Sequence, residues 1–98
     1  MNIQSQELWS LLTNEPQSKW ELADKLGCGE RQVRRCISEL RKSGFNVAAN
    51  SDGEGYWRGS DSDRKRTVNE LRSRAYKLIE TANALEKGPD LGQMEVEV

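Results

Sequence analysis

The stretch that decides the fold reads Ser18-Lys19-Trp20-Glu21-Leu22-Ala23-Asp24-Lys25-Leu26-Gly27-Cys28-Gly29-Glu30-Arg31-Gln32-Val33-Arg34-Arg35-Cys36-Ile37-Ser38-Glu39-Leu40-Arg41-Lys42-Ser43-Gly44-Phe45. Ser18 followed three positions later by Glu21 forms a capping box, which predicts the start of a helix. Gly27 is a natural stop for that helix. A second helix is expected from Glu30 to about Ser43, ended by Gly44. The stretch therefore predicts two helices joined by a tight turn.

The second of these helices has two different faces. Its apolar residues share one side at about 100° per residue, and they are Val33, Cys36, Ile37 and Leu40. Its polar and mostly basic residues share the opposite side, and they are Arg31, Arg34, Arg35, Ser38 and Lys42. The pattern predicts that one side of helix 30–43 faces a core and that the other is a basic stripe.

Elements on either side of this stretch complete a small domain. A shared apolar face of Leu8, Leu11 and Leu12 predicts a helix over residues 3–12. The alternation of Phe45, Val47 and Ala49 predicts a strand over residues 45–50. A turn at 51–55 and a return strand at 56–58 would make it a hairpin. The expected fold is mainly α with a small β-hairpin, and the aromatic residues Trp20, Tyr56 and Trp57 are expected to pack in the core or against the hairpin.

Neither glycine nor proline interrupts residues 61–87, which predicts one long helix. Its apolar residues are spaced alternately by three and four, a heptad pattern made by Val68, Leu71, Ala75, Leu78, Ala82 and Leu85. Such a helix spans about 40 Å, more than so small a domain can cover. We therefore expect a homodimer in which a second copy covers the stripe. The alternative is that the helix folds back and completes a monomeric core.

The chain of 98 residues is 35% apolar and 32% charged, and its net charge is −1. Acidic and basic residues are nevertheless concentrated in different segments. The net charge is −3 over 1–30, +3 over 31–60, +2 over 61–87 and −3 over 88–98. A phosphate backbone responds to the local patch, since salt screens charges beyond about 8 Å. We expect a domain over 1–59, a dimerisation helix over 60–87 and an acidic flexible tail over 88–98.

Several kinds of function are not expected. The chain has no histidine, and Cys28 and Cys36 alone do not make a zinc site or a favourable disulfide spacing, so neither a metal nor a disulfide is predicted. It has no nucleophile–base set and no phosphate-binding glycine loop, so we expect neither an enzyme nor a bound cofactor. Neither a basic leader nor a long apolar run is present, so a cytoplasmic location without a membrane is expected.

Residues 18–45 resemble the winged helix-turn-helix regulators of bacteria and phages, such as the DNA-binding domain of the biotin operon repressor. The matching residues are Glu21-Leu22-Ala23 with Leu26-Gly27, then Arg31, Val33-Arg34-Arg35, Ile37, Leu40-Arg41 and Gly44, and Gly55-Tyr56 after the hairpin. The resemblance covers about residues 5–58. It implies a winged helix-turn-helix followed by the long helix, and sequence-specific binding of double-stranded DNA by a small transcriptional regulator. Helix 30–43 would lie in the major groove.

The candidate DNA contacts fall into two sets. Those expected near base edges are Arg31, Gln32, Arg35 and Ser38, because arginine pairs with guanine and glutamine with adenine. Those expected near phosphates are Arg34, Arg41, Lys42, Arg58, Arg64, Lys65 and Arg66. The alternative for both sets is an ordinary solvated charged surface. A dimer would suit a two-fold symmetric operator with half-sites about one or two DNA turns apart.

A protein-interaction module is the alternative function. Asp52 and Glu54 make the tip of the expected hairpin acidic, and phosphates would repel it. The overall charge is also slightly negative. The chain would then be a small phage factor that docks on or inhibits a host protein. Double-stranded DNA is the first partner predicted and a protein the second.

Overall fold

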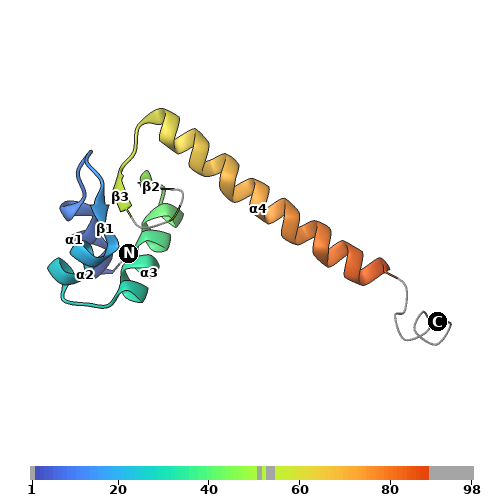
Figure 1. The fold of residues 1–98 in the computed structure, drawn as a ribbon, viewed down its shortest axis with the longest axis horizontal. Coiled ribbons are helices and arrows are strands. Elements are labelled where there is room, and N and C mark those ends of the chain that lie inside the picture. Colours follow the sequence, from blue (N-terminus) through green and yellow to red (C-terminus); the bar gives the residue numbers. More distant parts are fainter. Residues whose placement is uncertain (1, 51, 53–54, 89–98) are drawn as a thin grey trace. The chain divides into compact units, whose positions relative to one another are not determined.

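The computed structural model describes residues 2–50, 52 and 55–88. This part of the chain contains four α-helices and a three-stranded antiparallel sheet (Figure 1). The helices are α1 (Ile3–Leu11), α2 (Lys19–Leu26), α3 (Glu30–Lys42) and α4 (Asp61–Lys87), and the strands are β1 (Gln17–Ser18), β2 (Val47–Ala49) and β3 (Gly55–Arg58). The prediction of a mainly helical fold with a small hairpin and a long C-terminal helix is confirmed.

The chain divides into two compact units, residues 1–67 and residues 68–98. The acidic tail predicted for 88–98 lies outside the described residues from Pro89 onward. The predicted hairpin turn is described only at Asp52 and Gly55, so the tip residue Glu54 also lies outside them. The two units are therefore described separately, each by its own residues.

Local signals set the ends of α2 and α3 where the sequence places them. The Ser18 hydroxyl accepts a hydrogen bond of 3.0 Å from the backbone N–H of Glu21, which caps α2. Gly27 ends α2 in the left-handed backbone conformation, with φ of 67°. Residues that carry a side chain adopt this conformation only at a cost in free energy. Gly29 precedes α3 and supplies no side-chain cap. The start of α3 therefore has no side-chain cap.

The core of the first unit lies where α1, α2 and α3 meet the sheet. Its buried residues are Leu8, Leu12, Leu22, Ala23, Val33, Cys36, Ile37, Leu40, Val47 and Tyr56. The apolar face predicted for α3 is thus confirmed in full. Cys36 lies within this core and Cys28 is partly buried beside it, and both are free thiols.

The sheet has one strand that the sequence did not predict. Its strand order is β1-β3-β2, and Gln17 pairs with Tyr56 while Val47 pairs with Arg58. A strand of two residues, such as β1, has no detectable periodicity. The alternation predicted around Val47 is also wrong in part, because Ala48 is fully buried and Ala49 only partly. Ala48 is the register partner of Trp57, and a large indole on the same face of the sheet can cover a methyl group.

The aromatic residues divide between the core and the surface. Tyr56 is buried and Trp57 partly buried, as predicted. Trp20 is not a packing residue, because 52% of its surface is exposed. It precedes the buried Leu22 by two positions, which is about 200° around the helix. Of the two placements predicted for Trp20, the one in the core is therefore wrong.

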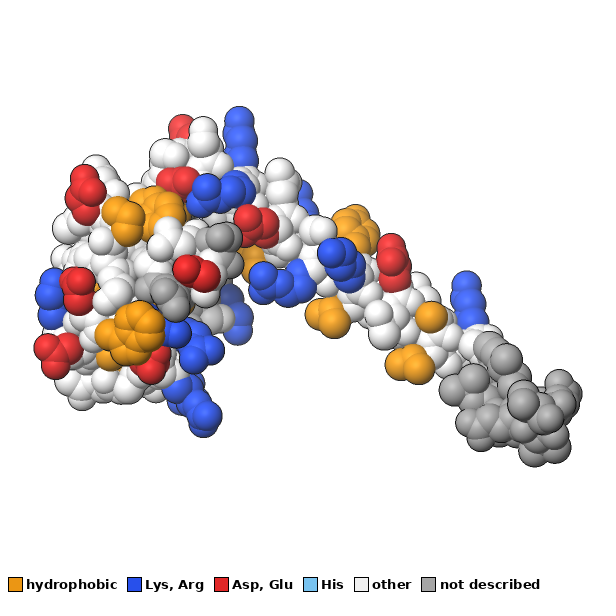
Figure 2. All heavy atoms as spheres, in the orientation of Figure 1, with side chains coloured by type: hydrophobic (Ala, Val, Ile, Leu, Met, Phe, Trp, Pro, Cys, Tyr) orange, Lys and Arg blue, Asp and Glu red, His pale blue; other side chains and the backbone are white. Residues whose placement is uncertain are grey.

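Helix α4 contains no buried residue. The apolar stripe is exposed in the single chain, with 44% of Leu71, 66% of Leu78 and 80% of Leu85 open to solvent. Orange side chains are visible along this helix in Figure 2. None of the helices described in this structure combines the length and apolar character that a membrane span requires.

Candidate nucleic-acid interface

One face of α3, which we call the outer α3 face, carries the cations that the sequence predicted there. It consists of the exposed residues Arg31, Arg34, Arg35, Ser38 and Lys42. The helix cannot rotate to bury them, because the opposite side is anchored by Val33 and Leu40, which are both fully buried. Figure 2 shows Lys and Arg side chains gathered over this side of the first unit.

The cations of the outer α3 face have no partners within the part of the chain that the structure describes. Arg31, Arg34, Arg35 and Lys42 form neither an ion pair nor a side-chain hydrogen bond there. Their hydrogen-bond donors are therefore available to an external anion, and charge-assisted bonds to phosphate are among the strongest that side chains form. The face can bind an anionic surface without first breaking an internal contact.

Two side chains of α3 that the sequence predicts to contact DNA form hydrogen bonds with neighbouring elements of the fold. The Gln32 side chain donates a hydrogen bond of 2.7 Å to the Gln4 side-chain oxygen on α1 and is partly buried. The Nε of Arg41 donates a bond of 2.9 Å to the carbonyl of Val47 on β2. Both residues join α3 to the rest of the first unit. The structure thus separates these two side chains from the outer α3 face.

Arg58 is a residue that the sequence predicts to contact a phosphate. In the structure its side chain lies inward. Its Nη2 donates a hydrogen bond of 2.7 Å to the carbonyl of Trp9, and its guanidinium carbon lies 4.2 Å from the centre of the Trp9 ring. The attraction of a cation to an aromatic face explains this placement. Arg58 is the one basic residue in the described parts of the hairpin and its flanks, residues 46–50, 52 and 55–60. Those residues therefore present no outward cation.

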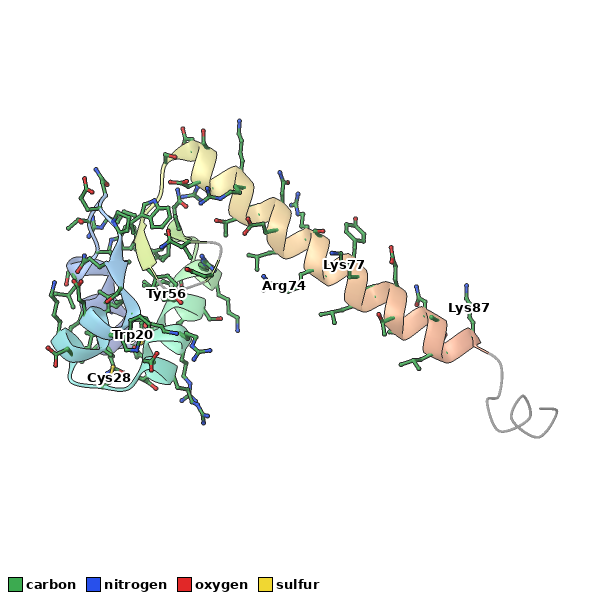
Figure 3. The ribbon with its side chains drawn as sticks, in the orientation of Figure 1. Trp20, Cys28, Tyr56, Arg74, Lys77 and Lys87 are labelled. Carbon is green, nitrogen blue, oxygen red and sulfur yellow. The ribbon has the colours of Figure 1, made fainter. Side chains whose placement is uncertain are left out.

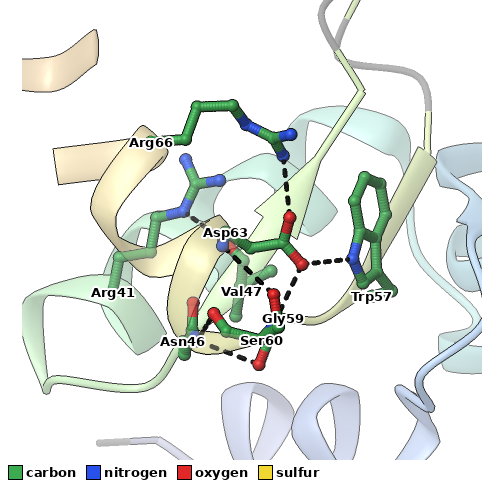
Figure 4. A network of polar contacts seen from close by, with 8 residues as sticks. All are labelled: Arg41, Asn46, Val47, Trp57, Gly59, Ser60, Asp63 and Arg66. Carbon is green, nitrogen blue, oxygen red and sulfur yellow. Dashed lines mark hydrogen bonds and ion pairs between the residues drawn. The ribbon is translucent and has the colours of Figure 1, made fainter. Parts of the chain in front are cut away.

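The start of α4 is fixed by a polar network around Asp63 (Figure 4). The Asp63 carboxylate accepts hydrogen bonds from the Ser60 backbone N–H at 3.0 Å and from the Trp57 indole at 3.1 Å. The Ser60 hydroxyl in turn accepts from the backbone N–H of Asp63 at 3.2 Å. The Ser60 hydroxyl therefore caps the start of α4. The backbone bond from Ser60, followed by the bond from Trp57, lowers the pKa of Asp63 below its ordinary value.

Two of the three cations that the sequence grouped at the start of α4 have contacts within the chain, and one of them joins this network. Arg66 forms an ion pair of 3.3 Å with Asp63. Arg64 reaches the carbonyl of Gly44 at 3.5 Å, a long contact. Lys65 is exposed and has no partner among the described residues. Lys65 is therefore the member of this group that is most available to a phosphate.

The start of α2 contributes two residues that the sequence interpretation missed. The Lys19 Nζ forms an ion pair of 3.3 Å with the Glu30 carboxylate, which joins the start of α2 to the start of α3. The same Nζ lies 4.9 Å from the centre of the exposed Trp20 ring (Figure 3). Lys19 thus offsets the charge of an acidic group at the start of α3. The helical phase of Trp20 relative to Leu22 was the signal that could have identified it as exposed.

The described residues contain no candidate metal site. No group of three or more histidine, cysteine, aspartate or glutamate side chains within them could hold a metal ion. No known protein family matches the chain, and neither a curated protein nor a solved structure matches it. The outer α3 face is the most distinctive chemical feature of the first unit.

Proposed function

We propose that the chain is a winged helix-turn-helix protein that binds double-stranded DNA sequence-specifically, as a small dimeric transcriptional regulator of bacterial or phage origin. The observation that carries this proposal is the outer α3 face, which presents four cations without internal partners on a helix that the core holds in place. Helix α3 follows α2 after three residues, and a hairpin follows α3. This order supports an arrangement in which α3 enters the major groove.

The roles of the side chains follow from their exposure. We assign Arg31, Arg35 and Ser38 to base edges and Arg34, Lys42 and Lys65 to phosphates, because these side chains are exposed. Gln32 would have to leave Gln4 before it could reach adenine. Arg41, Arg58, Arg64 and Arg66 have contacts within the chain and are expected to act as structural residues.

Binding to a fluorescent duplex pool of random sequence tests the proposal. Each phosphate contact contributes about −0.9 to the slope of log affinity against log salt. Replacing Arg34 and Arg35 together with alanine should reduce affinity at least about tenfold and flatten the slope by about one unit, since one of the two arginines is assigned to a phosphate. A matched control replaces Lys77 and Lys87 on α4, which removes the same charge from a helix other than α3 (Figure 3).

The outcomes separate specific charge placement from general attraction. Equal losses in the two double variants would mean that total charge alone drives binding. Absence of duplex binding by the folded wild-type chain at about 50 mM salt would refute the regulator proposal. If the chain binds, selection of bound sequences from the same pool would identify the operator. A pool that shows no enrichment would contradict sequence specificity.

A protein-interaction module is the second candidate function. It is favoured by the hairpin, whose described residues carry the acidic Asp52 and no outward cation. The exposed Trp20 adds an apolar contact of a kind that is enriched in protein interfaces. A folded chain that fails to bind duplex DNA would favour this candidate.

A further inference from the structure

The stripe of α4 consists of two rows of different size. The small row is Val68, Ala75 and Ala82, and the leucine row is Leu71, Leu78 and Leu85. These rows occupy the a and d positions of the heptad, through which paired helices touch. The six side chains span about 26 Å of helix, and none is buried in the single chain.

The difference in size distinguishes the two ways in which two such helices can pair. In a parallel pair each layer joins a residue to its own copy, so alanine faces alanine and leucine faces leucine. The distance between helix axes depends on the side chains at the contact and lies between 8 and 10 Å. Layers of alternating size therefore leave voids beside the alanines or strain at the leucines.

An antiparallel pair removes this mismatch. Each residue of the small row then faces one of the leucine row, since Ala75 meets Leu78 of the second copy and Ala82 meets Leu71 of the second copy. Val68 meets Leu85 of the second copy in the same register. Every layer then holds one large and one smaller side chain, so the axes can stay at one separation and the core can fill.

The charges beside the stripe favour the same orientation. Lys65 and Glu86 both occupy the e position of the heptad, and both are exposed. In the antiparallel register Lys65 of one copy lies near Glu86 of the other, and the pair occurs twice. A parallel pair would place the basic turn of Arg64, Lys65 and Arg66 beside its own copy. Like charges so placed destabilise helix pairs.

We propose that α4 pairs antiparallel with α4 of a second copy. The two-fold axis crosses the helix pair at the height between Tyr76 and Lys77. This inference rests on the dimer of the proposed function and adds its orientation. Its occupant is a second copy because the two rows are complementary to each other, whereas a different partner would have no reason to match both rows and the flanking charges.

Distances between spin labels test the orientation. The full chain would carry Cys28→Ser and Cys36→Ala, with a single new cysteine at the outward positions Ser73 or Lys87. In the antiparallel pair the labels at Lys87 should lie about 40 Å apart and those at Ser73 about 25 Å apart. A parallel pair would give about 25 Å at both positions. Ser73 is thus the matched control, because its expected distance is nearly independent of orientation.

Mass in solution at about 100 µM accompanies the distances, because dimerisation obeys mass action. A monomer, or an assembly larger than two, overturns the inference. A dimer with about 25 Å at Lys87 overturns the orientation and leaves the dimer of the proposed function intact. Neither result bears on duplex binding by Arg34 and Arg35, which is measured separately.

A charge exchange provides an independent test. Glu86→Lys and Lys65→Glu should each weaken the dimer by about threefold, and combining them should restore it. In a parallel pair the two positions lie at opposite ends, so the single effects would simply add. Additive effects therefore contradict the antiparallel pair even where a spin-labelled variant folds poorly.

Discussion

At the scale of single residues, arginine side chains lie in two different environments in this chain. Arg31, Arg34 and Arg35 are exposed and have no partner among the described residues, whereas Arg58 lies against Trp9 and is partly buried. Burial decides the difference, because a desolvated guanidinium needs partners that hold it. Position along the sequence does not reveal it, since the carbonyl that Arg58 binds belongs to a residue 49 positions away.

Replacing Arg58 with alanine should destabilise the first unit. The change removes a hydrogen bond and a cation–aromatic contact, and it leaves the carbonyl of Trp9 without its guanidinium donor. The free energy of unfolding should fall by about 1–3 kcal/mol in urea denaturation. Arg34→Ala is the matched control and should change it by at most about 0.5 kcal/mol. Unchanged stability together with lost DNA affinity would restore Arg58 as a phosphate contact.

At the scale of the elements, Asp63 connects the hairpin to the start of α4. Its carboxylate joins Trp57 of β3 to the capped turn at Ser60. The first turn of a helix favours an anion, because the unpaired backbone N–H groups point toward it. Asp63, which bonds reciprocally with the Ser60 cap, thus also positions the start of α4 against the sheet of the first unit.

The start of α4 should loosen in acid. Because the pKa of Asp63 is lowered in the folded chain, its contribution to stability is present above the ordinary value of 3.8 and is lost as the pH falls below it. The difference in unfolding free energy between the wild-type chain and Asp63→Asn should therefore shrink from neutral pH to about pH 3. Intrinsic fluorescence, to which Trp9, Trp20 and Trp57 all contribute, follows the unfolding. Asp61→Asn, which alters the same turn without these bonds, should show no such trend, and a constant difference for Asp63→Asn would contradict the assignment.

At the scale of the whole molecule, charge and apolar surface are arranged in separate places. The net charge of −1 provides no long-range attraction to DNA, so the binding that we propose would depend on the local cations of the outer α3 face. The apolar surface lies on α4, where Leu78 and Leu85 are 66% and 80% exposed. In the proposed dimer, pairing of this helix would bring two copies of the outer α3 face into one molecule.

A single charge in the stripe should abolish pairing. Leu78→Glu places two carboxylates at the centre of the proposed interface, and the mass in solution should fall to that of one chain. Asn83→Glu adds the same charge on the outward side of α4 and should leave the mass unchanged. If the wild-type chain is already monomeric at about 100 µM, the dimer proposal fails and the stripe has another role.

The sequence by itself determined the features that depend on neighbours a few positions apart. Helix ends at Ser18 and Gly27, the two faces of α3 and the uninterrupted run of α4 follow from capping, backbone conformation and helical period, which act within about four residues. These local rules place the five residues of the outer α3 face correctly.

Only the tertiary structure decided which polar side chains turn inward. Gln32 meets Gln4 across 28 positions, Arg58 meets Trp9 across 49, and β1 exists because β3 lies beside it. Such partners are brought together by packing of the core, and no local pattern encodes the distance between them. Gln32, Arg41 and Arg58 therefore have partners within the chain that the sequence did not reveal. The cations of the outer α3 face are exposed and need no internal partner.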